Sequence, residues 1–450
     1  MKNVVTVSIT TLGTDGEGIG ALSSGKKIFI PGALPGEEAE AEITEERSRF
    51  ARGKLLKIIR ASEDRTQEDP IPGANLIHLD YQKQLEYKKD KVRSCLIKIG
   101  GFKEEEADSI LNDTVPSGRE LHYRNHTQYK IDENTICFSE EGTGEAVKIA
   151  VSPLEYEVFS KIRLEMESIF KDAPQRLFSG LVLRGSERTK ELLIEFVTDM
   201  EGSHETIIRD ARDYIEKVDM ASGLKRAAGD FEIKGILLRI SPTRTDRRTR
   251  SGKRVVLTGS DSYREILCGR EFLIKAGAFF QVNTDQAEVL YKEASKGTES
   301  SKVIWDLYCG TGSIGLSVVK EGQELTGLEI SGEAVESAKI NAGLSHIENA
   351  KFILRDLSRT DISKEGLPSP DAVIIDPPRK GSDERTIRNI IAAGPETVVY
   401  ISCDPATLAR DLKQFRGSYD VKSVTPVDMF PQTSHVETVV MLSKGKSDLI

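Results

Sequence analysis

The chain lacks the paired cysteines that a disulfide framework or a zinc site requires. It has 5 cysteines, an odd number, and no two of them stand in a C-x-x-C arrangement. Disulfide-rich secreted domains and structural zinc sites both need closely spaced sulfur atoms. The sequence therefore predicts isolated reduced thiols and no bound metal ion, with the thiols at Cys95, Cys137, Cys268, Cys309 and Cys403.

Long hydrophobic runs are also missing. A membrane-spanning helix needs roughly 18 to 20 consecutive apolar residues, and no segment of this chain approaches that length. Residues 1–13 do not show the basic stretch followed by a long apolar one that is typical of a secretory signal. We therefore expect a cytoplasmic protein with no membrane partner. Its 450 residues, 38% of them hydrophobic, suffice for about three domains.

An excess of positive charge is the third feature that the chain lacks. Its 63 Lys and Arg residues against 72 Asp and Glu residues leave a net charge of -9. This argues against indiscriminate coating of nucleic acid, because that task needs many cations to replace phosphate counterions. One local exception, the basic segment at residues 239–270, has nine basic and three acidic residues. This segment indicates a phosphate contact, and a solvated loop is the alternative.

Turn residues and hydrophobic patterns divide the chain into three parts. Residues 1–62 contain short alternating strands between Gly-rich turns, which predicts a small closed barrel of a kind that often binds single-stranded nucleic acid. Residues 63–272 mix strands with helices, and a helical region near 81–112 is expected to pack on the last domain. Residues 273–450 alternate strands with helices, so we expect an α/β domain with ligands at the carboxyl ends of parallel strands.

A glycine-rich loop at residues 310–315 follows a predicted strand and opens a helix. The pattern matches the dinucleotide fingerprint, and so does Glu329 at the end of the next strand, where a ribose would bind. Asp306, just before the loop, would repel a pyrophosphate but suits a cationic ligand that carries an amino acid. We therefore predict a site for S-adenosylmethionine in preference to NAD, with Gly310 against the cofactor. A tight turn without a ligand is the alternative.

Two more acidic residues end predicted strands of the same domain. Asp376 closes the strand at 372–375 and is followed by two prolines, which fix the backbone beside the carboxylate. Asp356 follows the strand at 351–354, where it could meet the amino group of an adenine. The first pattern is also typical of an exposed proline turn and the second of a surface acid, so both readings stay open.

A cysteine and a glutamate near the C-terminus form the predicted reactive pair. Cys403 follows a predicted strand and precedes Asp404 and Pro405, which are typical of the N-cap and first residue of a helix. A thiol at a helix N-terminus can have a lowered pKa and act as a nucleophile. Glu437 precedes an apolar strand, where burial near the thiol would make it a base. A solvated edge carboxylate is the alternative, and His435 is interpreted as orienting or structural.

Together, these motifs resemble those of the RNA uracil-5-methyltransferase family, whose members use S-adenosylmethionine. The resemblance covers most of the chain and is most specific in five segments: residues 279–283 (FFQVN), 306–310 (DLYCG), 375–379 (IDPPR), 402–405 (SCDP) and 435–437 (HVE). Residues 1–62 are similar to the TRAM barrel of the members that act on ribosomal RNA, and Tyr123, Arg124 and Asn125 match a segment of the middle domain. The implied fold is a Rossmann-like class I methyltransferase domain with an N-terminal TRAM- or OB-like β-barrel and a mixed α+β central domain.

The resemblance also implies the roles of single residues. Cys403 would be the nucleophile and Glu437 the base. The cofactor site would be lined by Gln281, Tyr308, Glu329, Asp356 and Asp376. Without the family, Gln281 is only a neighbour of Asn283, which is a predicted helix N-cap paired with Gln286.

One departure from the family is informative. Many members bind a four-iron four-sulfur cluster through four cysteines, several of them in a C-x5-C-x2-C run just after the barrel. The matching residues 72–81 contain no cysteine, although the family's motif at residues 79–85 is intact. We therefore expect no iron–sulfur cluster, and packing must replace it.

The expected function is methyl transfer to carbon 5 of one uridine in structured RNA, through a covalent cysteine–uracil intermediate. By analogy with the family, 23S ribosomal RNA is favoured over transfer RNA, and we expect a monomer. Three other functions stay open. An amino-methyltransferase acting on an RNA purine would need the turn at Asp376 but not Cys403. An NAD-dependent oxidoreductase fits only the glycine loop, and a non-catalytic RNA-binding module fits only the barrel and the basic segment.

Overall fold

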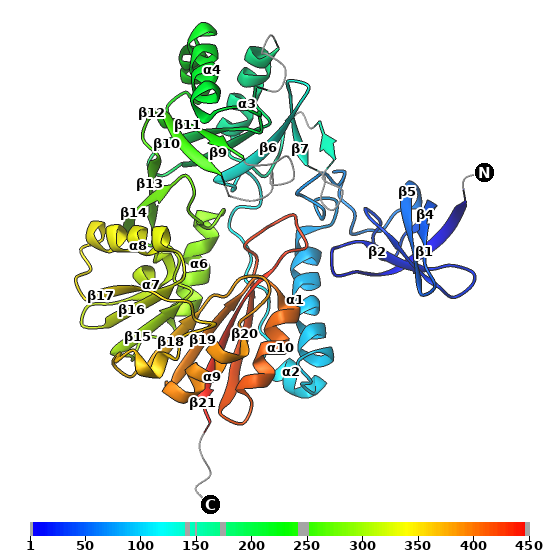
Figure 1. Ribbon diagram of the computed structural model, residues 1–450. Helices are drawn as coiled ribbons and strands as arrows, with labels where there is room; N and C mark the ends of the chain where they lie inside the picture. The colour runs from blue at the N-terminus through cyan, green and yellow to red at the C-terminus, as the bar shows by residue number, and fades with distance from the viewer. Residues whose placement is uncertain (1–2, 140–144, 149–150, 172–176, 242–251, 446–450) are drawn as a thin grey trace, which may run out of the picture. The chain divides into compact units, whose positions relative to one another are not determined.

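The computed structural model describes residues 3–139, 145–148, 151–171, 177–241 and 252–445. Four arginines of the basic segment lie outside the described residues: Arg244, Arg247, Arg248 and Arg250. The chain divides into two compact units. Figure 1 labels their helices and strands. The first unit comprises Met1–Gly118, Pro377–Ile391 and Glu396–Ile450, and the second comprises Arg119–Asp376 and Ala392–Pro395.

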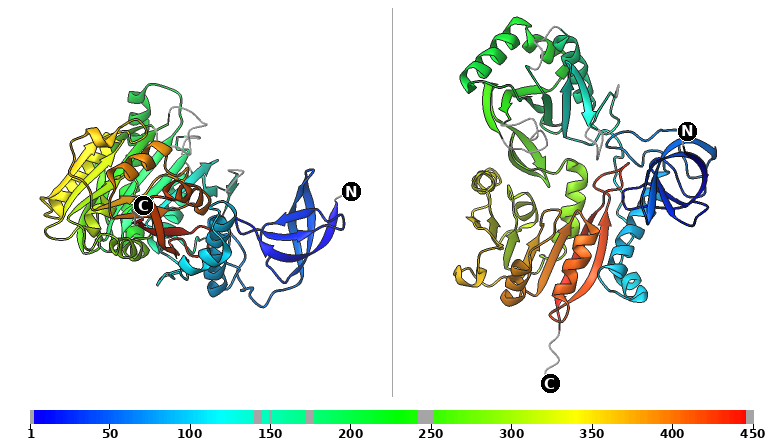
Figure 2. Two further views of the ribbon diagram at one scale, coloured as in Figure 1. Left: turned by 90° about the horizontal axis from the view of Figure 1, so that it is seen from below. Right: turned by 45° about the vertical axis from the view of Figure 1, so that its right-hand side comes forward.

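The first unit begins with a barrel of five strands: β1 (Val4–Leu12), β2 (Gly18–Ala21), β3 (Lys27–Ile30), β4 (Glu38–Glu46) and β5 (Phe50–Arg60). The strands close in the order β1-β2-β3-β5-β4. Figure 2 draws this barrel in blue, beside the N-terminus. Alternate residues point inward, so that Val7, Ile9 and Ile28 are almost completely buried. Gly20 is required, because a Cβ there would stand 2.2 Å from Val7 Cγ1. The predicted barrel is confirmed.

Two helices follow the barrel in the same unit: α1 (Tyr81–Lys98) and α2 (Glu104–Ile110). The Asp80 carboxylate caps α1 by accepting hydrogen bonds from two backbone N–H groups of the first turn. The amphipathic pattern of the sequence predicts this helix, but its buried face includes the polar residues Gln84 and Lys88.

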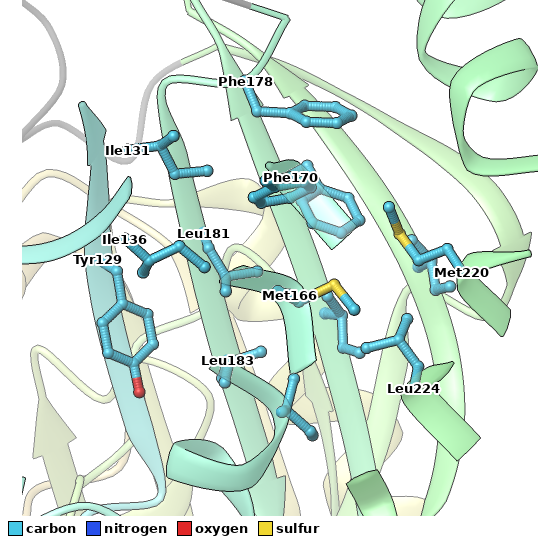
Figure 3. Close-up of a cluster of buried hydrophobic side chains, with 14 of the residues drawn as sticks. Tyr129, Ile131, Ile136, Met166, Phe170, Phe178, Leu181, Leu183, Met220 and Leu224 are labelled. Carbon is cyan, nitrogen blue, oxygen red and sulfur yellow. The ribbon is translucent and has the colours of Figure 1, made fainter. Parts of the chain in front are cut away.

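In the second unit, the first sheet along the chain has seven strands among the described residues, in the order β12-β11-β10-β9-β6-β7-β8. Its strands are β6 (His126–Asp132), β7 (Thr135–Ser139), β8 (Ala146–Val147), β9 (Gly180–Ser186), β10 (Glu191–Thr198), β11 (Glu232–Ile240) and β12 (Lys253–Gly259). Three helices pack on it: α3 (Glu157–Phe170), α4 (His204–Lys217) and α5 (Met220–Ala228). Figure 3 shows the apolar side chains between sheet and helices, such as Phe170, Phe178, Leu181 and Met220.

A hairpin of β13 (Ser262–Leu267) and β14 (Arg270–Lys275) packs against β9 and β10 of this sheet. Since helices also lie against the sheet, every residue of β9 and β10 is buried. The central α+β part of the chain thus has its own core.

A second seven-stranded sheet has the order β17-β16-β15-β18-β19-β21-β20. Within the second unit, parallel pairing joins β15 (Val303–Leu307), β16 (Glu324–Glu329), β17 (Ala350–Leu354) and β18 (Ala372–Ile375). Within the first unit, antiparallel pairing joins β19 (Thr397–Ser402), β20 (Tyr419–Val427) and β21 (Glu437–Lys444). The expected Rossmann-like domain is confirmed. The pattern did not predict β20, which contains Pro426 and is half exposed at the sheet edge.

The helices that accompany this sheet are α6 (Thr284–Ser295), α7 (Ser313–Val318), α8 (Gly332–Leu344), the 3-10 helix η2 (Ile362–Lys364), α9 (Glu384–Ala393) and α10 (Pro405–Phe415). In the second unit, α8 packs on β14, β16 and β17. In the first unit, α1 packs on α10 and β20. Among the described residues, no helix combines the length and the apolar composition needed to cross a membrane.

Candidate active site

The loop between β15 and α7 has an unusual backbone. Tyr308, Gly310 and Gly312 have φ angles of 63°, 54° and 79°. All three lie in the left-handed region, which glycine adopts freely and tyrosine does not. A Cβ at Gly310 would meet nothing within 4 Å, so the backbone is open there. A bulky residue in such a conformation points to a functional constraint, which supports Tyr308 as a member of the cofactor site.

Asp306, on β15, is completely buried. Its Oδ2 atom accepts a hydrogen bond of 2.9 Å from the backbone N–H of Gly315. Its Oδ1 atom is buried and has no hydrogen-bond partner among the described residues. Burial, together with the charges of Asp376 and Glu329, raises the pKa of Asp306 to about 8. A buried oxygen without a partner is suited to a donor group of a ligand.

Glu329, at the end of β16, ties the glycine loop to the segment that follows this strand. Its Oε2 atom accepts a hydrogen bond of 3.1 Å from the Gly310 N–H, and its Oε1 atom accepts one of 2.8 Å from the Ser331 N–H. Asp376, just after β18, is half-buried, and desolvation raises its pKa to about 7. We call Asp306, Glu329 and Asp376 the carboxyl cluster. Burial makes the negative charge of Asp306 and Asp376 unfavourable, and a cation beside them would offset this cost.

Asp356, after β17, has local partners instead. Its Oδ1 atom accepts hydrogen bonds from the backbone N–H and the hydroxyl of Ser358, at 3.1 and 2.6 Å. Its Oδ2 atom lies 3.3 Å from Arg359 Nε. These contacts are typical of an acid that stabilises its own turn.

Two segments that are far apart in sequence meet beside Gln281, which is buried. The Nδ2 atom of Asn125 donates to the Gln281 carbonyl at 2.9 Å and to the Thr284 hydroxyl at 3.0 Å. Asn283 caps α6 as predicted, because its Oδ1 atom accepts a hydrogen bond of 3.1 Å from the Gln286 N–H. The contact of Asn125 has no local sequence signal, and only its match to a family segment could have indicated it.

Cys403 and Glu437 lie in the first unit, at the end of the antiparallel ladder between β19 and β21. The last pair of that ladder is Ser402 with Thr438. Cys403 and Glu437 each stand one residue beyond this pair, Cys403 in a bend after β19 and Glu437 at the start of β21. Cys403 is half-buried, and Glu437 has only 6% of its surface exposed.

The helix after Cys403 begins as predicted. Asp404 is the N-cap of α10, and its Oδ1 atom accepts hydrogen bonds of 2.9 Å from the backbone N–H groups of Ala406 and Thr407. Pro405 is the first helical residue, where a missing N–H is tolerated. The thiol therefore stands directly before a capped helix.

A polar network without a sequence signal holds the proline loop after β18 to α10. Asp411 is completely buried, and its Oδ2 atom accepts hydrogen bonds from the Tyr400 hydroxyl at 2.7 Å and the Ser382 N–H at 2.8 Å. Arg410 donates to the Lys380 carbonyl at 2.8 Å. Gly381 is required, because a Cβ there would stand 2.5 Å from Asp411 Oδ2. The loop that begins one residue after Asp376 is thus attached to the helix that follows Cys403.

Arg239 does not supply the phosphate contact that the sequence predicts for the basic segment. This arginine is buried, and its Nε atom lies 2.7 Å from Glu195, which also pairs with Arg254 at 2.6 Å. Arg264 lies 2.7 Å from Glu191. The prediction is wrong for Arg239 because its charge is neutralised inside the sheet, where RNA has no access. Among the described residues, no group of three or more His, Cys, Asp or Glu side chains is suited to a metal ion.

The fold and the site define the chain as an S-adenosylmethionine-dependent methyltransferase. The structure matches the crystal structure of Pyrococcus abyssi tRNA (uracil-54, C5)-methyltransferase in complex with S-adenosyl-L-homocysteine. The TM-score is 0.76 at 26% sequence identity, and the match covers 97% of this chain and 100% of that chain.

Comparison of the sequence identifies the family. The model of the tRNA (uracil-5-)-methyltransferase family matches residues 248–445, and the model of the TRAM domain matches residues 3–56. A relative from Clostridium acetobutylicum, described as an uncharacterized RNA methyltransferase, is 34% identical over an alignment of 468 residues. This alignment covers 98% of this chain and 97% of the relative. A similarly described relative from Gloeobacter violaceus is 33% identical over an alignment of 473 residues, which covers 98% of this chain and 96% of the relative. The chain belongs to the RNA (uracil-5-)-methyltransferase family.

Proposed function

We propose that the enzyme methylates carbon 5 of one uridine in 23S ribosomal RNA, with Cys403 as the nucleophile and Glu437 as the base. The observation that carries this proposal is the register of β19 and β21, in which Cys403 and Glu437 follow the pair of Ser402 and Thr438. A nucleophile and a base that adjoin the same pair of strand residues can act on adjacent ring atoms. Carbon 6 and carbon 5 of uracil are such atoms.

The covalent step is needed because carbon 5 of uracil is a poor nucleophile. The Cys403 thiolate adds to carbon 6, and the electron pair of the carbon 5–carbon 6 double bond moves into the ring as an enolate. When bound, S-adenosylmethionine supplies an electrophilic methyl group to carbon 5. Glu437 then removes the carbon 5 proton, the carbon 6–sulfur bond breaks, and the thiolate is restored. The uridine must leave its stack to reach the thiol.

The second unit contains the residues that we assign to the cofactor. The unpartnered Oδ1 atom of Asp306 and the acids around it suit an ammonium group. Glu329 suits the ribose hydroxyls, since each carboxylate oxygen accepts one backbone hydrogen bond and keeps a further lone pair. Asp376 would hold the ammonium group or the edge of the uracil. The same assignment includes Gln281, Tyr308, Gly310 and, at the adenine, Asp356.

Cofactor binding is expected to depend on pH. The pKa is raised to about 8 for Asp306 and to about 7 for Asp376, so both are partly protonated near neutral pH. An ammonium group bound beside them favours their charged forms and lowers both pKa values. The affinity for S-adenosyl-L-homocysteine should therefore rise as the pH increases to about 8 and then level off, with release of protons on binding.

Calorimetric titrations in buffers of different ionisation enthalpy measure this proton release. Asp306→Asn should remove most of it, whereas Glu348→Gln, which changes an exposed acid of the same unit, should leave it at the wild-type value. Binding without proton release, at an affinity that is constant between about pH 6 and 9, would contradict the assignment of the carboxyl cluster to the ammonium group.

Transfer RNA is the second candidate substrate. The structural match to the Pyrococcus abyssi enzyme, which is a tRNA (uracil-54, C5)-methyltransferase, favours it. The resemblance of residues 1–62 to the TRAM barrel of ribosomal-RNA members favours 23S ribosomal RNA. Transfer of labelled methyl groups to fragments of 23S ribosomal RNA and to tRNA transcripts distinguishes the two. Methylation of tRNA alone would overturn our choice of substrate and leave the chemistry intact.

RNA that contains 5-fluorouridine tests the chemistry. Fluorine replaces the proton that Glu437 would remove, so the covalent intermediate cannot resolve. We expect a protein–RNA adduct that survives denaturation and forms only with S-adenosylmethionine. An amino-methyltransferase acting on a purine would methylate a verified RNA substrate without any adduct, and that result would refute the proposal.

The proposal includes a cytoplasmic monomer without an iron–sulfur cluster. Residues 72–81 offer no cysteine for a cluster. Protein purified without oxygen is expected to contain no stoichiometric iron or acid-labile sulfide, and light scattering should give the mass of one chain. Iron and sulfide at four atoms each per chain would contradict the first expectation.

A further inference from the structure

The segment between β20 and β21, residues 428–436, is irregular and almost entirely buried. Irregular segments usually run over the surface, because their backbone N–H and C=O groups need water or another partner. Gln432, in its middle, has a φ angle of 67°. The segment leads directly into Glu437, so whatever holds it also sets the position of the proposed base.

One face of α1 supplies polar partners to this segment. Tyr81, Gln84, Lys88 and Lys91 are three or four positions apart, so they lie on the same side of the helix. We call these four residues the polar stripe. A helix that packs against a core normally presents apolar residues on that side. The polar stripe therefore calls for an explanation other than hydrophobic packing.

The first contact of the polar stripe is a buried ion pair. Lys88 pairs with Asp428, and both side chains are 0% exposed. Lys88 also donates to the Phe430 carbonyl at 3.1 Å, and the Tyr81 hydroxyl donates to the second Asp428 oxygen at 2.8 Å. Buried ion pairs contribute little net stability but impose one arrangement, because any other leaves a charge without a partner.

The second contact joins two glutamines. The Nε2 atom of Gln84 donates to Gln432 Oε1 at 2.8 Å, and the Oε1 atom of Gln84 accepts a hydrogen bond of 3.0 Å from the Gln432 N–H. Gln84 Nε2 also donates to the carbonyls of Leu76 and Leu79, at 3.1 and 2.9 Å. One side chain thus holds both the left-handed residue of the segment and the chain that precedes α1.

The third contact is made at Ser434. Lys91 donates to its carbonyl at 2.8 Å. Asn75 accepts a hydrogen bond of 3.0 Å from its N–H and donates to its hydroxyl at 3.1 Å. The segment is therefore held at Asp428, Gln432 and Ser434, and the last of these stands three residues before Glu437.

We propose that the polar stripe and Asn75 are positioning residues of the catalytic base: they hold residues 428–434 so that Glu437 faces Cys403. This inference rests on the proposed function. The physical reason is that Glu437 is the first residue of β21, so its position depends on the chain that leads into the strand as well as on the ladders. Residues 430–433 form a hydrogen-bonded turn with Gln432 in the left-handed region, and the contacts from α1 and Asn75 hold this turn and the residues that follow it.

Gln84→Met tests the proposal, with Gln82→Met as its matched control. Gln82 belongs to the same helix and is exposed, so the control makes the same chemical change away from the segment. Gln84→Met should lower kcat on uridine RNA about tenfold to a hundredfold, as expected for a displaced catalytic group. Its KM for RNA should stay close to the wild-type value, and Gln82→Met should match the wild type in both.

Two adduct measurements separate positioning from general damage. With 5-fluorouridine RNA, where the base has no proton to remove, Gln84→Met should form the adduct at the wild-type rate. With ordinary uridine RNA and S-adenosylmethionine, it should accumulate a methylated adduct that the wild type does not accumulate. Equal losses in turnover and in 5-fluorouridine adduct, or unchanged turnover, would overturn the inference.

Asn75→Ala is the second variant, for the case that Gln84→Met does not fold. It removes the contacts at Ser434 from a half-buried position, and the same pattern is expected with a smaller loss of turnover. Thermal unfolding of each variant checks its fold. If the wild type itself forms no adduct with 5-fluorouridine RNA, the proposed function fails. If the wild type forms the adduct and the variants turn over as fast as the wild type, the proposed function stands and only the positioning role is refuted.

Discussion

Alanine in place of Cys403 is expected to lower the rate of RNA methylation by about 10⁴-fold or more, since loss of a catalytic nucleophile has effects of this order. Without the thiolate, carbon 5 of uracil keeps its low reactivity and cannot take up the methyl group. The measurement is the initial rate of labelled methyl transfer to the best RNA substrate. The variant should also form no adduct with 5-fluorouridine RNA.

Cys95→Ala is the matched control for this variant. Cys95 is a half-buried thiol on α1, and burial raises its pKa, so it is a poor source of thiolate. The control should methylate RNA at the wild-type rate, and Cys403→Ala should still bind S-adenosyl-L-homocysteine. A denaturation-resistant adduct in Cys403→Ala would show that another residue is the nucleophile.

Glutamine in place of Glu437 is expected to lower turnover by about 10²- to 10⁴-fold, the usual contribution of a general base. The addition of Cys403 and the uptake of the methyl group come before proton removal, so both should proceed. The variant should therefore accumulate a methylated covalent adduct with ordinary uridine RNA. Denaturing gel electrophoresis with labelled S-adenosylmethionine measures this adduct.

Glu384→Gln is the control for the loss of a carboxylate. Glu384 begins α9 in the same unit, and its side chain is 74% exposed. Its replacement should change neither turnover nor adduct formation. If Glu437→Gln turned over slowly without accumulating an adduct, proton removal would belong to another group, and the pairing of Glu437 with Cys403 would be structural.

The glycine loop shows which structural features are predicted by residues that are close in sequence. The strand, the glycines and the helix start between Asp306 and Gly315 are predicted by residues that are close in sequence, because backbone geometry at each position depends on its own side chain. The N-caps at Asn283 and Asp404 are predicted for the same reason and are confirmed. In contrast, the left-handed φ of Tyr308 was not foreseen, since the surrounding structure and not the residue type imposes it.

Charge patterns were the least reliable guide. The excess of basic residues at 239–270 predicted a phosphate contact for this segment, but Arg239 pairs with Glu195 from a neighbouring strand of the sheet. Gln84 and Lys88 were expected to belong to an ordinary amphipathic helix, but they hold residues 428–434 from more than 300 positions away, as the separations of 340 and 348 show. A polar side chain does not indicate its partner by its own identity.

The closed barrel, the strand, glycine loop and helix at residues 303–318, and the family are determined by the amino-acid sequence alone, because each depends on local conformation or on contiguous motifs. The burial of Asp306 and Glu437 and the contacts of α1 with residues 428–434 were decided only by the tertiary structure. The physical reason is that register, burial and ion pairing depend on which distant residues come together, and desolvation exists only once they have packed.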